Sequence, residues 1–379
     1  MIINFLIIIQ VKMKKVLILG AGNAQIDAIH YCKEQGWKVF GCSYTNTDKG
    51  IPYLDVFKQI DIKDIDGIAK YVEEENIDIV YSIGSDLAMP TVMKVSEMTH
   101  RPHFISYDAA LTCQNKNKMR AKLGADFKGN IPFVEVSDLD AACRFNEFPA
   151  MMKPTDSQGQ RGCYKVNSVK DIKEYFEISL SYSNEGKVII EKYVEGPEIS
   201  VNAYVVNGQL KFALVSDRIV FEDLPGGIIK EHHLPSVFAT ETAQKNTVDM
   251  VNAALKKLEI NNGPAYFQIK LDGENPVIIE VTPRLDGCHM WNLIKHYCNV
   301  DLLDITWQHL VNQKIGNFDL NIKSATKKLK FMCEKPGVPF DRAKYNVNDA
   351  EYCNWYYESG DIVKKLNGYM EKGGYIIVD

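Results

Sequence analysis

Residues 266–271 read YFQIKL and residues 277–284 read VIIEVTPR, with a turn at Gly273 between the two apolar runs. This pattern predicts a β-hairpin in which Gln268 and Glu280 lie on neighbouring strands and can meet. A glutamate ending an apolar strand can simply be exposed, but the flanking residues indicate a covered strand, where a lone carboxylate is costly. Oxygen ligands of this kind suit Mg²⁺, or Mn²⁺ in its place, together with water and nucleotide phosphates. The hairpin therefore predicts a metal site.

Two lysine-containing segments precede the hairpin. Residues 115–120 read NKNKMR and open a basic, amphipathic helix, which taken alone is typical of a solvated run of charge. Residues 148–154 read FPAMMKP and predict a short strand near Lys153, followed by a loop of small residues. The glycines of that loop, Gly159 and Gly162, let backbone N–H groups converge on phosphate oxygens, and the lysine adds a point charge. The alternative for this segment alone is a polar hairpin loop.

A further segment carries two carboxylates. Residues 188–198 read VIIEKYVEGPE and lead into a strand predicted over 199–206. Glu191 and Glu198 can bracket an adenosine, with backbone groups near Val194 reading the adenine edge and Glu198 accepting hydrogen bonds from ribose hydroxyls. The alternative is a pair of surface glutamates.

From Lys14 the chain alternates strand and helix patterns, which indicates a doubly wound parallel sheet. Strands are predicted at 16–19, 38–42 and 77–83, and helices over 23–36 and 65–72. The turn at 20–22 (GAG) resembles a dinucleotide-binding turn, but Gln25 stands where a third glycine is wanted and residues 42–44 (CSY) supply no ribose-binding acid. We therefore expect a Rossmann-like domain without nicotinamide chemistry.

Composition bounds the partners and the compartment. The chain has 379 residues, a length that predicts two or three domains. Its formal net charge is −5, so it has no excess of basic residues that would indicate nucleic-acid binding. Its nine cysteines include no CxxC motif, as expected of thiols in a reducing compartment. The apolar run over 1–11 is shorter than the roughly 20 residues that span a bilayer. We expect a cytoplasmic protein with no membrane partner.

The order of these motifs resembles the ATP-grasp superfamily, from Lys14 to a closing strand at 373–377. The run over 191–198 is similar to that of D-alanine–D-alanine ligases. The Gln268 and Glu280 pair resembles the metal site of the carbamoyl phosphate synthetase large subunit and of L-amino acid ligases. Thr282 stands where the family usually has an asparagine whose oxygen binds metal, so we expect a second metal to be held there more loosely or through water.

The resemblance implies a role for each matching residue. The ATP-binding residues would be Lys116, Lys153, Ser157, Gly159, Gly162, Glu191, Lys192, Val194 and Glu198. The metal ligands would be Gln268, Glu280 and Thr282. Arg284 and Lys153 would be catalytic, since a guanidinium binds a phosphoryl group in a forked geometry. Arg218, His233, Arg284 and Asp286 would line the substrate side.

The resemblance also implies an architecture, α/β and α+β, with ATP between two sheets and not at the turn over 20–22. The expected parts are an extension at 1–12 of doubtful structure, a Rossmann-like domain at 13–110, an ATP-grasp core at 111–310 and a C-terminal α+β segment at 311–379. Within the core, about 115–190 would form a mobile lid, whose 156–162 loop closes over ATP.

The activity implied is ATP-dependent ligation. A carboxylate becomes an acyl phosphate that an amine attacks, with release of ADP and phosphate, and no nucleophilic side chain is needed. One alternative is carboxyl phosphate chemistry like that of carbamoyl phosphate synthetase, although this chain has one module and no glutaminase-like cysteine and histidine. The others are a non-catalytic nucleotide-binding subunit and, after it, a dehydrogenase. Family members are often dimers, so the resemblance also implies a homodimer.

Overall fold

The computed structural model describes residues 13–157, 161–224, 227–366 and 369–379. A four-stranded parallel sheet in the order β3-β2-β1-β4 forms the N-terminal domain. Its elements are β1 (Lys15–Leu19), α1 (Asn23–Glu34), β2 (Lys38–Ser43), a 3₁₀ turn (Ile51–Tyr53), β3 (Val56–Gln59), α2 (Ile65–Glu75), β4 (Ile79–Tyr81) and α3 (Met89–Met98). Strand β1 is apolar and buried after Lys15, because helices cover both faces of such a sheet.

The turn after β1 is closed by a side chain of its own helix. The amide oxygen of Gln25 accepts a hydrogen bond from the Gly22 N–H at 3.0 Å, and its amide nitrogen donates to the Ile83 carbonyl. The Gly22 N–H, which in a dinucleotide-binding turn would face a phosphate, is therefore bonded within the protein. Gln25, which departs from the glycine pattern, is thus the residue that completes this turn.

A second, smaller domain is built on an antiparallel sheet in the order β5-β8-β6-β7. Helices α4 (Tyr107–Gln114) and α5 (Lys116–Leu123) lead into it. Its elements are β5 (Phe133–Val136), α6 (Leu139–Ala142), β6 (Ala150–Pro154), β7 (Tyr164–Val166), α7 (Val169–Ser181) and β8 (Val188–Lys192). It has a core of its own, in which Met152, Phe176 and Ile190 are buried. We call residues 133–192 the lid.

The largest sheet has eight strands in the order β13-β12-β9-β10-β11-β14-β16-β15, all antiparallel. Its strands are β9 (Glu198–Val206), β10 (Gln209–Val220), β11 (Ile229–Leu234), β12 (Gly263–Asp272), β13 (Asn275–Thr282), β14 (Lys327–Glu334), β15 (Tyr352–Trp355) and β16 (Glu371–Val378). Three helices accompany it: α8 (Glu241–Lys257), α9 (Met290–Cys298) and α10 (Leu302–Asn312), and a 3₁₀ turn spans Arg342–Lys344. We call this sheet the base sheet.

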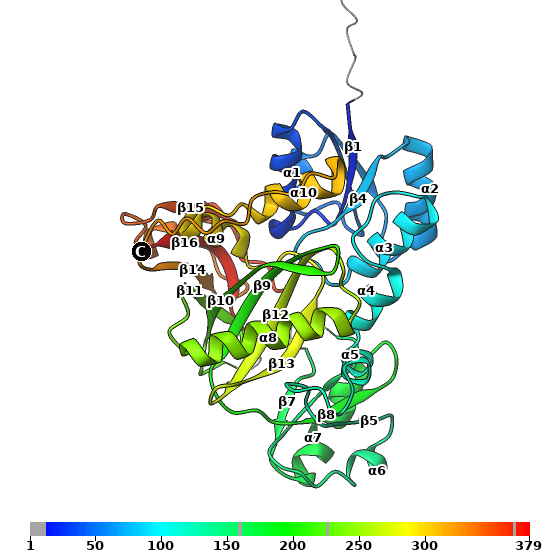
Figure 1. Cartoon of the computed structure of the whole chain (residues 1–379), viewed down its shortest axis with the longest axis vertical. Coiled ribbons are helices and arrows are strands. Elements are labelled where there is room, and N and C mark those ends of the chain that lie inside the picture. Colours follow the sequence, from blue (N-terminus) through cyan, green and yellow to red (C-terminus); the bar gives the residue numbers. More distant parts are fainter. Residues whose placement is uncertain (1–12, 158–160, 225–226, 367–368) are drawn as a thin grey trace, which may run out of the picture.

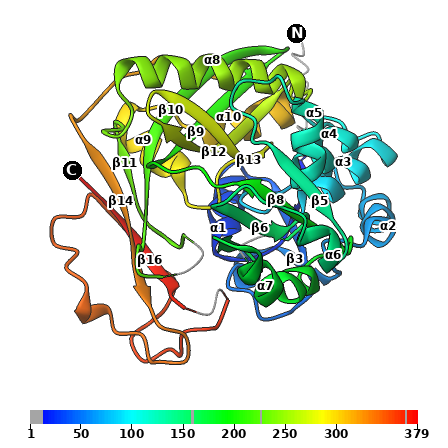
Figure 2. The same ribbon diagram turned by 90° about the horizontal axis from the view of Figure 1, so that it is seen from below.

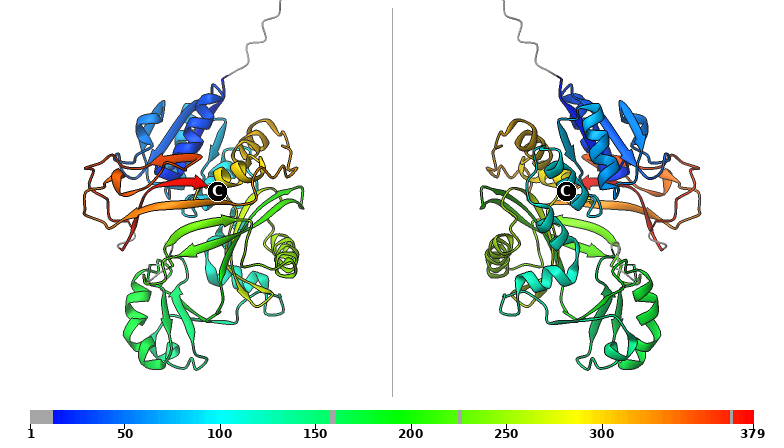
Figure 3. Two further views of the ribbon diagram at one scale, coloured as in Figure 1. Left: turned by 90° about the vertical axis from the view of Figure 1, so that its left-hand side faces the viewer. Right: turned by 90° about the vertical axis from the view of Figure 1, so that its right-hand side faces the viewer.

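The base sheet lies between the N-terminal domain and the lid along the long axis of the molecule (Figures 1 and 3). Its C-terminal strands β14 and β16 lie to one side of the lid when the molecule is seen from below (Figure 2). Residues from the last fifth of the chain therefore complete a sheet that begins at Glu198, because β11 pairs with β14.

The two faces of the base sheet differ in polarity. Ser200 lies opposite Gln268, and Gln268 lies opposite Glu280, so one face is polar across three strands. The next residues along these strands, such as Val201 after Ser200 and Phe267 before Gln268, point to the other face. They are fully buried in the main core, which also includes the apolar side of α8. The alternation of β-structure therefore directs the polar residues of the hairpin toward one face.

These sheets confirm the expected fold class, a Rossmann-like α/β domain followed by α+β subdomains. No helix in the described part of the chain is long and apolar enough to cross a membrane. The predicted extension at 1–12 lies outside the described residues.

Candidate active site

A cavity of about 590 Å³ lies between the lid and the base sheet. Ten of the residues singled out in the sequence line it: Lys116, Lys153, Ser157, Glu191, Lys192, Val194, Glu198, Arg218, Gln268 and Glu280. They come from the start of α5, from β6 and β8 of the lid, and from four strands of the base sheet or their ends. Segments up to 164 residues apart in sequence therefore meet at one cavity. Gly159 lies outside the described residues.

On the lid wall, charges are paired within the protein. The Glu191 carboxylate accepts from the Arg120 Nε at 2.9 Å and from the Lys153 Nζ at 2.6 Å, and all three side chains are almost fully buried. Burial alone would raise the pKa of the Glu191 carboxyl, but the charges and hydrogen bonds of Arg120 and Lys153 lower it to about 2. The carboxylate is therefore ionised, and it fixes the position of the Lys153 ammonium at the cavity.

Arg120 is a residue that the sequence interpretation did not single out. Its side chain is fully buried, and besides Glu191 it donates to the Ile278 carbonyl at 2.7 Å and the Ile279 carbonyl at 3.2 Å. It thus joins the lid to β13, directly before Glu280. The sequence held a signal for it, since Arg120 lies four residues after Lys116 and so on the same face of the predicted helix.

Lys116 sits where the lid wall meets the base wall. Its ammonium donates to the Ser157 carbonyl at 2.8 Å, and it lies 4.0 Å from a carboxylate oxygen of Glu280. Because its neighbours Asn117 and Arg120 are also buried, the predicted helix is not a solvated run of charge.

On the base wall, Glu198, Arg218 and Gln268 form a connected group. Arg218 pairs with Glu198 from the neighbouring strand, and the Gln268 amide nitrogen donates to the same carboxylate at 3.0 Å. The amide oxygen is then the atom of Gln268 that suits a hard cation. The structure confirms the predicted hairpin, with Gln268 directly opposite Glu280.

The residues expected to bind a metal fit Mg²⁺. Among the described residues, Lys116 is the one cation within 4.0 Å of Glu280, whose side chain is 28% exposed at the cavity. Thr282 lies two residues further along β13, and its buried Oγ1 has no hydrogen-bond partner in the described part of the chain. Carboxylate, amide and hydroxyl oxygens on one face make a donor set for a hard cation.

Five predicted residues of the described chain lie outside the cavity lining: Gly162, His233, Thr282, Arg284 and Asp286. The Arg284 guanidinium donates to Asp86 of the N-terminal domain at 2.6 Å from Nε and to the Leu285 carbonyl at 2.9 Å. His233 of β11 faces Glu231, with 2.8 Å between Nε2 and the carboxylate. Gly162 has a φ of +72° and packs near Pro154.

The contact of Arg284 with Asp86 belongs to a tight junction between domains. Gly84 has a φ of +65°, and a Cβ there would lie 2.9 Å from the Cα of Gly287. Only glycine allows the two loops to approach so closely. The N-terminal domain thus holds the segment that follows β13.

The cavity also contains residues to which the sequence assigned no role. Its apolar lining consists of Ile131, Met151, Val220, Phe221, Leu224 and Ile279, and Tyr164, Lys165, Tyr193 and Lys270 add further polar and aromatic contacts. The ring of Tyr193 contacts two of these cations, with the ammonium of Lys165 4.0 Å and that of Lys270 5.4 Å from its centre. An apolar lining beside charged groups suits a ligand with a flat base and an ionic tail.

A larger hollow of about 720 Å³ lies elsewhere, where the end of α3 approaches α10. Its lining includes His100, Arg101, Phe104 and His309 but none of the predicted site residues. Chemistry, not size, therefore identifies the cavity below the lid as the candidate site.

Comparison with known proteins identifies a domain within the chain. Residues 146–291 match the model of the ATP-grasp domain. The chain is 25% identical over 360 residues to phosphoribosylamine–glycine ligase of Methanocaldococcus jannaschii, covering 86% of this chain and 79% of that protein. It is 20% identical to an uncharacterized protein of Sinorhizobium fredii, over 70% of this chain, and spans about half of that relative (56%).

Solved structures share the fold over almost the whole chain. The L-amino acid ligase of Bacillus licheniformis superposes with a TM-score of 0.78 at 18% identity, covering 96% of this chain and 93% of that one. The biotin carboxylase domain dimer of Hydrogenobacter thermophilus 2-oxoglutarate carboxylase, solved with MgADP, ADP and bicarbonate, has a TM-score of 0.77 at 13% identity, over 96% of this chain and 86% of that one. Residues 146–291 therefore form an ATP-grasp domain, and the chain as a whole shares the fold of these solved structures.

Proposed function

We propose that the protein is an ATP-dependent ligase that activates a carboxylate as an acyl phosphate and joins it to an amine, releasing ADP and phosphate. The observation that carries the proposal is the cavity wall on which Glu280 lies opposite Gln268 and 4.0 Å from Lys116. On such a wall, the Glu280 carboxylate can bind a metal ion, and the Lys116 ammonium beside it can bind phosphate. The similarity to phosphoribosylamine–glycine ligase supports carboxylate–amine chemistry.

The charged residues of the cavity would bind different parts of ATP. Lys153, held by Glu191, and Lys116, held by the Ser157 carbonyl, present ammonium groups to the ATP phosphates. Glu198 and the backbone near Val194 would bind the adenosine, next to the apolar lining. These groups position ATP and neutralise its charge, which is the main contribution that a protein makes to phosphoryl transfer.

Gln268 and Glu280, with Thr282 beside them, would hold Mg²⁺ or Mn²⁺. When bound, such an ion neutralises phosphate charge and polarises the transferred phosphoryl group. The MgADP in the Hydrogenobacter structure supports this assignment.

The test is a screen for ADP release with pooled carboxylic acids and amines, followed by mass spectrometry of the products. We expect ADP, not AMP, in step with an amide product. Tight binding of ATP without turnover across a broad panel would overturn the proposal in favour of a nucleotide-binding subunit. Release of ADP that depends on bicarbonate alone, without any amide product, would favour carboxyl phosphate chemistry.

The substrate side stays a prediction. Arg218 lines the cavity, whereas Arg284 and Asp286 are buried beyond it, so we propose the edge near Arg218 as the place where the carboxylate or amine enters. A homodimer and a cytoplasmic location are likewise proposed, and light scattering of the purified protein tests the first.

A further inference from the structure

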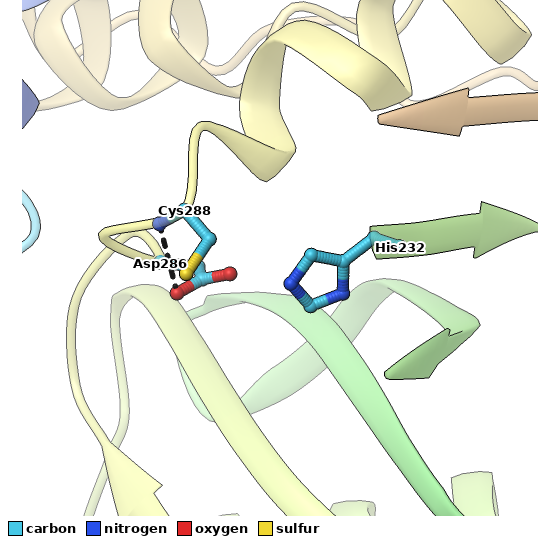
Figure 4. A group of neighbouring side chains, drawn as sticks. All are labelled: His232, Asp286 and Cys288. Atoms are coloured by element: carbon cyan, nitrogen blue, oxygen red, sulfur yellow. Dashed lines mark hydrogen bonds between the residues drawn. The ribbon is translucent and has the colours of Figure 1, made fainter. Parts of the chain in front are cut away.

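Behind the Arg218 edge of the cavity, three side chains of different chemistry converge. His232 comes from β11, and Asp286 and Cys288 come from the loop between β13 and α9 (Figure 4). One nitrogen, one carboxylate oxygen and one sulfur atom from these residues all lie within 4.8 Å of one another, and all three residues are buried. We call them the HDC cluster.

Three buried polar atoms of this cluster lack a hydrogen-bond partner in the described part of the chain. Neither ring nitrogen of His232 has a hydrogen bond within the described part of the chain, although the residue is fully buried. The Oδ1 of Asp286 accepts from the Cys288 N–H at 3.2 Å, but its Oδ2 is also buried and unpaired. Buried polar atoms are almost always satisfied, so unpaired atoms on two facing residues indicate a missing shared partner.

We propose that His232, Asp286 and Cys288 bind one divalent transition-metal ion of zinc-like chemistry, at a site separate from the magnesium site expected at Gln268 and Glu280. Imidazole nitrogen, carboxylate oxygen and thiolate sulfur are the three ligand types that Zn²⁺ takes in proteins. Mg²⁺ does not suit this set, because it prefers oxygen ligands. Three protein ligands would leave a fourth position for water or a ligand atom.

The geometry requires a small closure. Bonds of about 2.0–2.3 Å in a tetrahedral site put ligand atoms about 3.3–3.7 Å apart. The ligand atoms of the HDC cluster, within 4.8 Å of one another, therefore have to approach by roughly 1.5 Å at most. His232 and Cys288 come from different segments, so side-chain rotation can supply this movement without changing the fold.

A lysine competes with the metal for the sulfur. The Lys372 ammonium lies 3.2 Å from the Cys288 Sγ and 3.7 Å from the centre of the Phe331 ring. On metal binding, the Cys288 thiol would lose its proton to solvent, a metal–sulfur bond would form, and Lys372 would leave the sulfur. The Phe331 ring would still stabilise the displaced cation.

The test measures bound metal and not activity, so it can fail without affecting the proposed ligase function. The full chain is incubated with excess Zn²⁺, desalted and analysed by inductively coupled plasma mass spectrometry. We expect about one ion per chain, and a loss of affinity of about tenfold or more in His232→Ala and in Cys288→Ser. Melting temperatures show that each variant is folded.

Matched controls lie close by. His233→Ala changes the next residue of the same strand, Cys298→Ser changes another buried cysteine, and Glu280→Gln removes the carboxylate of the proposed magnesium site. All three are expected to retain the Zn²⁺. Absence of bound Zn²⁺ in the wild type, or an equal loss in the controls, would overturn the proposal, and a water molecule between His232 and Asp286 would then be the shared partner.

A second measurement needs no variant and covers the case in which Cys288→Ser does not fold. The wild-type protein is loaded with Co²⁺, and its absorption spectrum is recorded. A sulfur-to-cobalt charge-transfer band is expected. Bound Co²⁺ without that band would show that Cys288 is no ligand and would overturn the assignment.

Discussion

The two walls of the cavity treat their carboxylates in opposite ways. On the lid wall, Glu191 has two cations at hydrogen-bond distance and is fully enclosed. On the base wall, Glu280 has one lysine at 4.0 Å and is partly open to the cavity. The first carboxylate serves the structure by holding Lys153 and Arg120, whereas the second is available to a cation from outside. Similar residues in one cavity thus have different tasks because their neighbours differ.

The largest effect is expected when the lid wall loses its charge. Glu191→Gln leaves Arg120 and Lys153 buried without a counter-ion, which costs about 3–5 kcal/mol of the free energy of unfolding. Urea denaturation measures this loss. Glu135→Gln, which removes the exposed partner of Lys187 on the same sheet, is the control and should cost only about 0.2–1 kcal/mol. Equal losses in the two variants would contradict the contrast between buried and exposed pairs.

On the base wall, the effect should fall on turnover and not on stability. Glu280→Gln removes charge but little volume, so we expect ADP release to fall by about 10²–10³-fold while the melting temperature is unchanged. Excess Mg²⁺ or Mn²⁺ should restore activity only in part. Glu274→Gln, in the turn of the same hairpin, is the control. Wild-type turnover of Glu280→Gln at limiting Mg²⁺ would place the metal site elsewhere.

Acid should weaken the lid wall in the wild type. The pKa of Glu191 is about 2 in the folded protein against an ordinary value of 4.5, so its contribution to stability is complete above pH 4.5 and is lost as the pH falls toward about 2. Unfolding free energies measured across this range should converge between wild type and Glu191→Gln. Parallel curves would show that Glu191 is not the group responsible.

The smallest effect is expected at the adenosine end of the cavity. Glu198→Gln should raise the KM for ATP about tenfold with a smaller change in kcat, as when mainly uniform binding is lost. Steady-state kinetics in which ATP is varied, with the carboxylate and the amine at saturating concentrations, measure both constants. Glu195→Gln, an exposed glutamate on the same turn, should leave the KM unchanged. A fall in kcat alone would place Glu198 near the transferred phosphoryl group instead.

The turn between these two glutamates shows how local sequence and distant packing combine. Gly196 has a φ of +109°, and a Cβ there would lie 2.0 Å from the Leu271 carbonyl oxygen. The glycine was visible in the sequence, but the reason for it was not. The reason is the close approach of this turn to the end of β12, a strand more than 70 residues away.

The sequence by itself determined many of the strands, the hairpin partners and ten of the residues that line the cavity. Apolar runs and their glycine boundaries define β1, β8, β12 and β13, and pairing across a short turn is local enough to predict Gln268 opposite Glu280. The motif order also identified ten residues that line one cavity. These features depend on period and spacing along the chain, which the sequence contains directly.

Only the tertiary structure decided which charges are paired and which side chains face each other. Arg120 with Glu191 and Arg284 with Asp86 join residues 71 and 198 positions apart, and no periodicity links them. The choice between His232 and His233 depends on the register of β11 against β10, because a shift of one residue reverses the face of every side chain in a strand. The register places His232 opposite Arg218, and His232 then lies near Cys288. Packing across the whole sheet, and not the local sequence pattern, fixes that register.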